Sequence, residues 1–346
     1  MTTLLLSGLA VTAAVCASLT AAVIPLLRRA RVVDVPGDRS LHRTPVPRGG
    51  GLAIVLAASL ATWTAVLAAV HLQGAVHAMS GVDVALMGLA TVLAFALLGL
   101  IEDLFSVSVR TRLVLQLVLG AGLGLVAHSA FEVSLWWTPA ICVGTAALVN
   151  ATNFMDGANG LACGHALLTS LWYVQVAAVA PVAGLGLVMV SVAGACLGFL
   201  PFNTPRAKVF LGDSGSYALG SAWAFAVTAC LSRGVAVEAA LAPVLVLLAD
   251  TGYTLWMRLR AGQCWYEPHR LHVYQRLVCA GWPHWASALL VTLAAAACSA
   301  LAASSLLTSN RLWMPQVAMA AVLIVYLKMP SIIGAPNPFP TLRRAR

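Results

Sequence analysis

An all-α polytopic membrane protein is the fold class that this sequence predicts. Of the 346 residues, 61% are hydrophobic and only 9% are charged, whereas a soluble domain is usually about 25% charged. The mean hydropathy of +0.92 agrees with this composition. Such a chain cannot be hydrated over most of its surface, so we expect one integral membrane domain that covers residues 1–346.

Eleven apolar runs are candidates for membrane-spanning helices, since a spanning helix needs about 20 apolar residues. The first run has no basic residue before it and is too long for a signal-peptide core, so we expect it to be retained. Only Pro181 divides residues 161–200, which leaves ten spans as the alternative. The expected spans are 3–27, 49–70, 84–101, 112–128, 135–151, 161–179, 181–200, 214–231, 239–257, 285–306 and 313–329.

The placement of the basic residues predicts the orientation of the chain. A formal net charge of +9 would favour a nucleic-acid partner in a soluble protein. With the N-terminus outside, however, all but two of the 20 Lys and Arg residues fall in inner loops or in the C-terminal tail; the exceptions are Arg233 and Arg311. Because cytoplasmic loops are enriched in these residues, we expect a periplasmic N-terminus, a cytoplasmic C-terminus and no nucleic-acid partner.

Carboxylates are scarce in this chain and gather at one face. Only 11 residues are acidic, and the expected topology places eight of them at the cytoplasmic side, among them Glu102, Asp103, Asp156, Asp213 and Asp250. Acidic side chains at membrane depth are costly and mark functional sites. The pattern predicts a metal or phosphate site at that face. Asp250 is equally compatible with a pair to a neighbouring basic residue.

Glu102 and Asp103 close an apolar run that we expect to be helical. Adjacent carboxylates at a helix C-terminus repel each other and oppose the helix dipole. A positive group must therefore offset them, either Mg²⁺ or one of the nearby residues Arg110 and Arg112. The alternative interpretation is a solvated helix end that pairs with those arginines.

Four polar residues at a spacing of three follow in the chain: Asn150, Asn153, Asp156 and Asn159. In a helix they would lie along one side, and their oxygen atoms suit Mg²⁺. Asn and Asp next to Gly also form turns and caps, which is the alternative interpretation.

Asp213 and Ser214 stand at the start of an expected span, a few residues after Lys208. A helix N-terminus attracts anions. A metal ion bound to the Asp213 carboxylate could in turn bind a phosphate. The site would then hold an anion, as a helix N-terminus favours. The alternative is that the two residues only cap the helix.

Two basic loops complete the set of candidates. Residues 42–51 join Arg48 and other cations to three glycines, a composition that can wrap an anionic headgroup. Residues 269–272 contain His269, Arg270 and His272, which predict a phosphate-binding cluster. The alternatives are a juxtamembrane basic anchor and a plain basic surface loop. The eight Cys form no CxxC pair, so we expect structural thiols rather than disulfides or a zinc site.

Five strings in the chain together resemble the polyprenyl-phosphate N-acetylhexosamine-1-phosphate transferase family (glycosyltransferase family 4). They are residues 34–51, the Glu102-Asp103 pair, and residues 153–162, 207–216 and 269–277. Each string alone is a weak signal, but five in order over most of the chain are highly specific.

The resemblance implies a Mg²⁺-dependent enzyme, with Mn²⁺ as an alternative ion, in the inner membrane of a bacterium. Its active site would face the cytoplasm. It would transfer N-acetylhexosamine-1-phosphate from a UDP-sugar to undecaprenyl phosphate and release UMP. A homodimer is left open.

The chain departs from the family pattern at three places. Members usually have Asp-Asp where this chain has Glu102-Asp103, and bacterial relatives often have Asp at the position of Asn159. The muramyl-pentapeptide branch has three consecutive histidines where this chain has His-Arg-Leu-His at 269–272. The chain is therefore more similar to the enzymes that start O-antigen or related surface glycans, as in lipopolysaccharide biosynthesis.

The resemblance also implies a role for each candidate residue. The implied metal ligands are Asp213, Asn153 and Asp156. The implied substrate-binding residues are Lys208, His269, Arg270 and His272 for phosphates, Arg48 for the acceptor headgroup, and Asn159 for the uracil or nearby groups. The implied catalytic residues are Asp103, Glu102 and Asp156, with Asp103 as the base or nucleophile.

In such a reaction the acceptor phosphate attacks an anionic diphosphate, so charge repulsion is the main obstacle. A phosphate monoester has a second pKa of about 6 and is mostly dianionic at neutral pH. We therefore expect little benefit from a general base, and a covalent route through Asp103 stays open at this point.

Two other classes of function compete with the transferase. A secondary transporter would also have many spans and membrane-embedded acids, but transporter sites lie near the midplane and no inverted repeat is apparent in this sequence. A non-enzymatic scaffold for membrane assembly would leave the Asn/Asp/Gly strings without an explanation.

Overall fold

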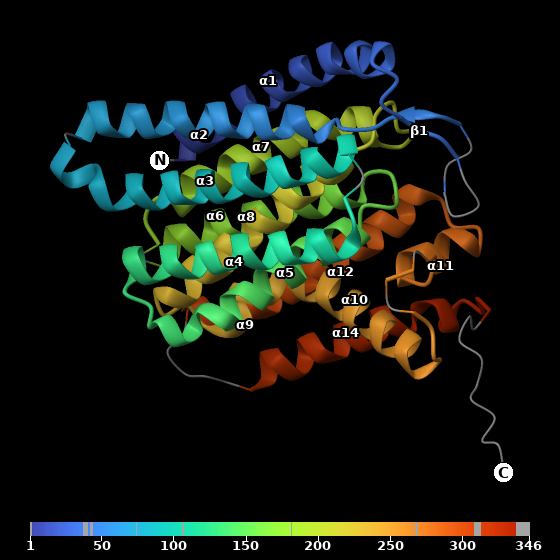
Figure 1. The fold of residues 1–346 in the computed structure, drawn as a ribbon. Coiled ribbons are helices and arrows are strands. Elements are labelled where there is room, and N and C mark those ends of the chain that lie inside the picture. The colour runs from blue at the N-terminus through green and yellow to red at the C-terminus, as the bar shows by residue number, and fades with distance from the viewer. Residues whose placement is uncertain are drawn as a thin grey trace.

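The computed structural model is a bundle of long helices that run side by side (Figure 1). It describes residues 2–36, 41, 44–73, 75–105, 107–180, 182–264, 266–267, 269–307 and 313–336. The long helices are α1 (Thr2–Arg29), α2 (Gly51–Gln73), α3 (Ala75–Phe105), α4 (Val109–Phe131), α5 (Thr138–Phe154), α6 (Leu161–Val179), α7 (Leu185–Asn203), α8 (Gly212–Ser232), α10 (Leu245–Arg260), α12 (His284–Ala302) and α14 (Met314–Ile332).

The remaining elements are short. They are β1 (Val33–Asp34), β2 (Val46–Pro47), η1 (Leu135–Trp137), α9 (Val237–Leu241), η2 (Ala242–Val244), α11 (Val273–Cys279) and α13 (Ser304–Leu307). Within the described ranges, each of the eleven predicted spans overlaps helix, and the one at 239–257 is divided among α9, η2 and α10. The stretch 161–200 forms two helices, because α6 ends at Val179 and α7 begins at Leu185.

The all-α polytopic fold class is confirmed. In the described part of the chain, 9 helical stretches are long and apolar enough to cross a membrane. The two predicted spans outside this set are α5, which has only 17 residues, and α8, which contains Asp213 and several serines and glycines. The number of crossings and the orientation of the termini stay predictions.

Several residues behind the topology prediction lie outside the described residues. They are Arg39, His42, Arg43, Pro181, Arg311, Arg343, Arg344 and Arg346.

Helix α8 is the core of the bundle. Every residue from Gly212 to Cys230 is buried, and α3 and α5 pack against it. Glycines permit this close packing: a Cβ at Gly99 of α3 would lie 2.3 Å from the carbonyl oxygen of Asp213, and one at Gly220 would lie 2.6 Å from the Cα of Val149. The ends of α3 and α5 are thereby held beside the beginning of α8.

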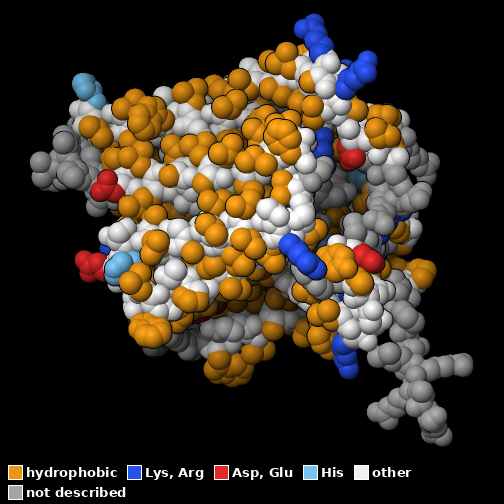
Figure 2. All heavy atoms as spheres, viewed as in Figure 1, with side chains coloured by type: hydrophobic (Ala, Val, Ile, Leu, Met, Phe, Trp, Pro, Cys, Tyr) orange, Lys and Arg blue, Asp and Glu red, His pale blue; other side chains and the backbone are white. Residues whose placement is uncertain are grey.

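The connections at one end of the bundle carry most of the candidate residues. β1 pairs antiparallel with β2, and Arg48 continues into a parallel bridge with Phe210. In Figure 1 this end, at the right, also contains α11 and the last residues of α14. Figure 2 shows Lys and Arg gathered at the same end, beyond a broad hydrophobic band over the helices. This distribution agrees with a bundle that lies in a bilayer with one basic face.

Candidate active site

Three helix ends meet at the basic end of the bundle. Asp103 lies in the last turn of α3, Asn153 in the last turn of α5, and Asp213 in the first turn of α8. The amide of Asn153 donates to Oδ1 of Asp213 at 2.7 Å and to Oγ of Ser216 at 3.0 Å. Residues far apart in the sequence therefore form one polar cluster.

Asp103 caps helix α8 from outside that helix. Its carboxylate accepts the backbone N–H of Asp213 at 3.0 Å and that of Ser214 at 2.9 Å. An anionic group stabilises the positive end of a helix dipole, and only 3% of this side chain is exposed. The interpretation of Asp213 as the cap of its own helix is therefore wrong: no side chain of α8 caps it, and Asp103 does so instead.

Arg48 joins the two carboxylates. Its Nε lies 2.9 Å from Oδ1 of Asp103, and one terminal nitrogen lies 2.7 Å from Oδ2 of Asp213. The backbone of Arg48 is fixed by its N–H, which donates to Val32, and by the bridge to Phe210. Arg48 thus neutralises part of the negative charge of the cluster. The family resemblance had implied that this residue binds the acceptor headgroup.

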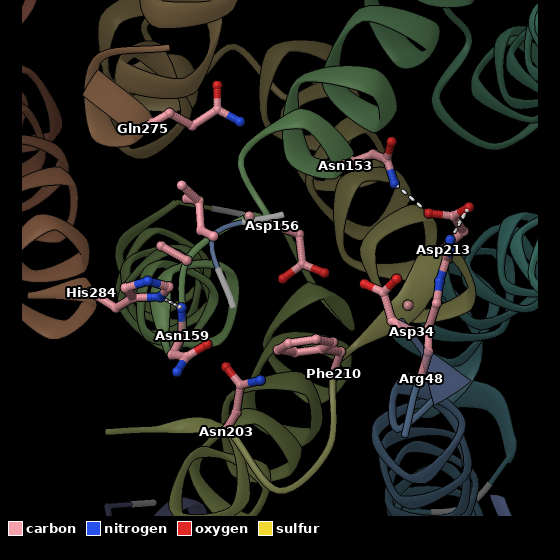
Figure 3. A pocket seen from close by; sticks show the side chains of 14 residues that line it. Asp34, Arg48, Asn153, Asp156, Asn159, Asn203, Phe210, Asp213, Gln275 and His284 are labelled. Atoms are coloured by element: carbon pink, nitrogen blue, oxygen red, sulfur yellow. Dashed lines mark hydrogen bonds and ion pairs between the residues drawn. The ribbon is translucent and has the colours of Figure 1, made fainter. Parts of the chain in front are cut away.

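Asp156 faces a polar cavity of about 320 Å³ beside this cluster. In Figure 3 its carboxylate points into the cavity, toward Asp34. Burial and the nearby carboxylate of Asp213 raise the pKa of Asp156 well above its ordinary value. Three aspartates, Asp34, Asp156 and Asp213, line the cavity with Arg48 as the cation among them. The excess of carboxylates favours a bound cation.

The oxygen atoms of this site suit Mg²⁺ that is also bound by substrate, rather than a metal ion held by protein ligands alone. Among the described residues, no group of three or more His, Cys, Asp and Glu could hold a metal ion. Asp156, Asp213 and Asn153 nevertheless place two carboxylates and an amide on one cavity. Mg²⁺ is usually held by one or two carboxylates together with waters and substrate phosphates. The residues present therefore fit an ion that is completed by substrate.

The cavity includes residues that the sequence motifs did not single out. These are Asp34, Asn203, Gln275 and His284. Asp34 and Gln275 lie in the matched strings 34–51 and 269–277, which were a usable signal, but nothing in the sequence marked Asn203 or His284. Asn203 ties two loops together, since it accepts the N–H of Gly160 at 2.7 Å and donates to Val209 at 3.0 Å.

Asn159 also lines the polar cavity, and its contact with the uracil stays a prediction. Its amide donates to the carbonyl of Pro205 at 3.2 Å, and its backbone N–H donates to Nδ1 of His284 at 3.2 Å. Asn150 is different, because its side-chain amide donates a hydrogen bond to Oε1 of Gln116 in α4.

A second, mostly apolar cavity of about 700 Å³ adjoins the first. Residues from α4, α5 and α10 line it, and it borders on Asn153, Asp156, Gly157 and Gln275, which also line the polar cavity. A polar cavity and an apolar one therefore meet at Asp156.

The basic candidates divide between these cavities and the surface. His269 and His272 line the apolar cavity, whereas Arg270 and Lys208 line neither of the two. Lys208 is exposed, with its Nζ 5.7 Å from the centre of the Phe202 ring. The histidines, unlike these two cations, are placed to contact a molecule in the cavities.

His269 is a neutral hydrogen-bond donor rather than a cation. Burial, with His272 and Arg258 nearby, lowers the pKa of His269 to about 3. Its Nδ1 accepts the backbone N–H of Leu271 at 3.2 Å, which leaves the proton of the neutral ring on Nε2.

Glu102 lies outside the polar cluster. It accepts the backbone N–H of Val107 at 2.9 Å and pairs with Arg112 at 3.3 Å, so it fastens the turn between α3 and α4. It lines neither cavity. Pairing with a nearby arginine, the alternative interpretation of the acidic pair, therefore holds for Glu102.

We expect Glu102→Gln to keep transferase activity within about fivefold of wild type, because a partly exposed ion pair contributes up to about 1 kcal/mol. The amide oxygen can still accept the N–H of Val107. The measurement is kcat/KM of the purified variant. A loss of two orders of magnitude would restore Glu102 to the catalytic set.

Gly157 is a position at which we expect a larger side chain to lower the stability of the fold. A Cβ there would lie 2.2 Å from Oη of Tyr274, which donates to the carbonyl of Phe154 at 2.9 Å. Overpacking of this kind costs about 1–3 kcal/mol. Gly157→Ala should therefore lower the thermal unfolding midpoint, and the second change Tyr274→Phe should recover part of the loss. An unaltered midpoint in Gly157→Ala would contradict this packing.

Comparison with known proteins places the chain in a family. Residues 85–231 match the model of glycosyl transferase family 4. The chain is 31% identical, over 78% of its length and 75% of the relative, to the decaprenyl-phosphate N-acetylglucosaminephosphotransferase of Mycobacterium leprae. It is 27% identical, over 78% and 77%, to the probable undecaprenyl-phosphate N-acetylglucosaminyl 1-phosphate transferase of Bacillus subtilis.

A phospho-N-acetylmuramoyl-pentapeptide-transferase from Desulforudis audaxviator is 32% identical, over 57% of this chain and 68% of the relative. The resemblance inferred from the five strings is confirmed by these matches, and the polar cluster with Arg48 takes its residues from four of those strings. The chain belongs to glycosyl transferase family 4, the polyprenyl-phosphate hexosamine-1-phosphate transferases.

Proposed function

We propose that the protein transfers N-acetylhexosamine-1-phosphate from a UDP-sugar to undecaprenyl phosphate and releases UMP. The observation that carries the proposal is the junction of the two cavities at Asp156. The polar cavity suits an anionic, water-soluble donor with its cation, and the apolar cavity suits the first isoprene units of a lipid acceptor. The names of the relatives, which act on decaprenyl or undecaprenyl phosphate, support the same reaction.

Asp213, Asp156 and Asn153 are the residues that would hold Mg²⁺, or Mn²⁺ in its place. When bound, the ion would neutralise charge on the diphosphate and on the leaving UMP. Arg48 adds a fixed positive charge beside these groups. His269 and His272 would contact phosphate oxygens from the apolar side.

Asp103 has a positioning role in this proposal. Its two oxygens receive two backbone N–H groups and Nε of Arg48, an arrangement that stabilises the anion and holds it away from substrate. Asp156 faces the cavity instead, with no hydrogen-bond partner recorded for its carboxylate among the described residues. We therefore favour direct attack by the acceptor phosphate over a covalent route through Asp103.

The basic end of the bundle would face the cytoplasm of a bacterium, where UDP-sugars are made, and the N-terminus would be periplasmic. Cell-wall or surface-glycan synthesis is the corresponding pathway class, with O-antigen and lipopolysaccharide as one branch. A homodimer is compatible with these assignments.

The decisive experiment supplies purified protein with Mg²⁺, undecaprenyl phosphate and, in turn, UDP-GlcNAc or UDP-GalNAc. We expect UMP release that requires both the lipid and the metal and that favours one sugar. Decaprenyl phosphate in a parallel reaction tests the choice of lipid. UMP release that is indifferent to lipid would overturn the proposal, and uptake of a solute into proteoliposomes would favour the transporter.

A further inference from the structure

Asp250 is a buried carboxylate that the reaction described above does not use. It lies in α10 and is 0% exposed. A carboxylate in such a position is costly unless hydrogen bonds satisfy it. Its oxygens accept the Oη–H of Tyr326 at 2.7 Å, the Oγ1–H of Thr254 at 3.2 Å and the backbone N–H of Val273 at 3.1 Å and 3.2 Å.

The remaining partner of Asp250 is the ring of His272. Nδ1 of His272 lies 3.1 Å from Oδ1 of Asp250. A carboxylate accepts but does not donate, so Nδ1 must carry the proton in this contact. The ring then has Nε2 as its second polar atom.

Aromatic neighbours fix the plane of the same ring. The centre of the His272 ring lies 6.1 Å from that of Tyr274, with an angle of 12° between the planes, and 6.1 Å from that of Phe154 at 27°. The ring of His269 lies 4.9 Å away on the cavity lining. Packing thus limits the tilt of the ring, while the carboxylate selects which nitrogen points inward.

We propose that Asp250 is a positioning residue for phosphoryl transfer: it receives Nδ1–H of His272 and so directs Nε2 into the apolar cavity that His272 lines, toward a substrate phosphate. This inference rests on the proposed function, because it assigns His272 a substrate contact in that reaction. Tyr326 of helix α14 donates to the other oxygen of Asp250, Oδ2, so it does not take part in the contact with His272.

A double-mutant cycle tests the inference. The four proteins are wild type, Asp250→Asn, His272→Asn and the double variant, each checked for its thermal midpoint and assayed for kcat and KM of the UDP-sugar. Asn at 272 can keep a donor near Nδ1 but removes Nε2. Partners that orient a functional histidine contribute about 10- to 100-fold, so we expect kcat to fall by that factor in Asp250→Asn, with KM changed less than threefold.

The double variant decides between a positioning role and a structural one. If Asp250 acts through His272, the double variant has kcat within about threefold of His272→Asn, because effects that share one route do not add. If the reductions in kcat of the two single variants multiplied in the double variant, the inference would be overturned. A wild-type kcat in Asp250→Asn would overturn it as well. Tyr326→Phe is the matched control: it removes a hydrogen bond from Oδ2 but leaves the contact of Oδ1 with His272, so kcat should stay within threefold of wild type.

A second measurement does not depend on whether Asp250→Asn folds. NMR of wild-type protein with ¹⁵N-labelled histidine should show a protonated Nδ1 whose signal is lost in His272→Asn. An unprotonated Nδ1 at His272 would overturn the inference. If wild type released no UMP, the proposed function would fail while this signal still reported on the contact between Asp250 and His272.

Discussion

Asp213→Asn is expected to lower kcat/KM by roughly a thousandfold, the upper end of what one preorganised electrostatic group contributes to a transition state. Two donors surround the carboxylate, the amide of Asn153 and the guanidinium of Arg48. An amide has only one acceptor oxygen, so the variant must turn its own N–H₂ toward one of these donors. It also removes a negative charge from the oxygen set that we assign to Mg²⁺.

The measurement is UMP release over a series of Mg²⁺ concentrations, in which the variant should need more metal for half of its maximal rate. Asp83→Asn is the matched control. Asp83 is an exposed residue of the same α3 helix that carries Asp103, and the predicted topology puts it on the outer side. Activity of this control should stay within about twofold. Wild-type rates for Asp213→Asn at all metal concentrations would remove Asp213 from the metal ligands.

Asp103→Asn is expected to lower kcat by about a hundredfold, and raising the pH should not restore it. The carboxylate accepts two N–H groups at the beginning of α8 and pairs with Arg48. An amide would set an N–H₂ group against one of these donors. The first turn of α8, which carries Asp213, would then shift. Loss of a cap costs about 1–2 kcal/mol, so the thermal midpoint should fall as well.

The pH dependence separates this account from general base catalysis. The acceptor phosphate has a second pKa of about 6, so it is already deprotonated at pH 7 and above. We expect the rates of wild type and Asp103→Asn to run parallel from about pH 7 to pH 9. A variant whose rate climbed toward wild type as the pH rises would identify Asp103 as the base. Glu102→Gln, one residue earlier, is the natural control for the change in charge.

The helices were predictable because hydropathy is a local property. Each expected span is an apolar run, and each overlaps helix in the described chain. The ends of the spans were also predictable, because apolar character is lost there. Those predicted ends placed the acids of three motifs at the same membrane face. The contacts of a side chain, by contrast, often join residues that are far apart in the sequence. The contact of Asp103 with Asp213 joins residues 110 positions apart, and no pattern within one motif indicates which carboxylate caps which helix.

The same limit explains why the sequence alone could not assign the partners of Glu102 and Asp250. Both acids resembled site residues because membrane carboxylates are rare, but one fastens a turn and the other is buried behind His272. Asn203 and His284 were missed, and Gln275 was not singled out within its string, because a single amide or imidazole at a helix or loop end is common in any protein. Only the packing of α7, α11 and α12 around the loop after α5 brings them to the cavity.

The burial of α8 from Gly212 to Cys230 has a consequence for how the protein enters the membrane. This helix is not among the stretches apolar enough to cross a membrane by composition, and a segment with such polar content is a poor substrate for insertion on its own. Its neighbours α3 and α5 precede it in the chain. We therefore expect α8 to leave the insertion machinery only when these earlier helices accept it. Truncated chains that lack α3 should fail to integrate this segment.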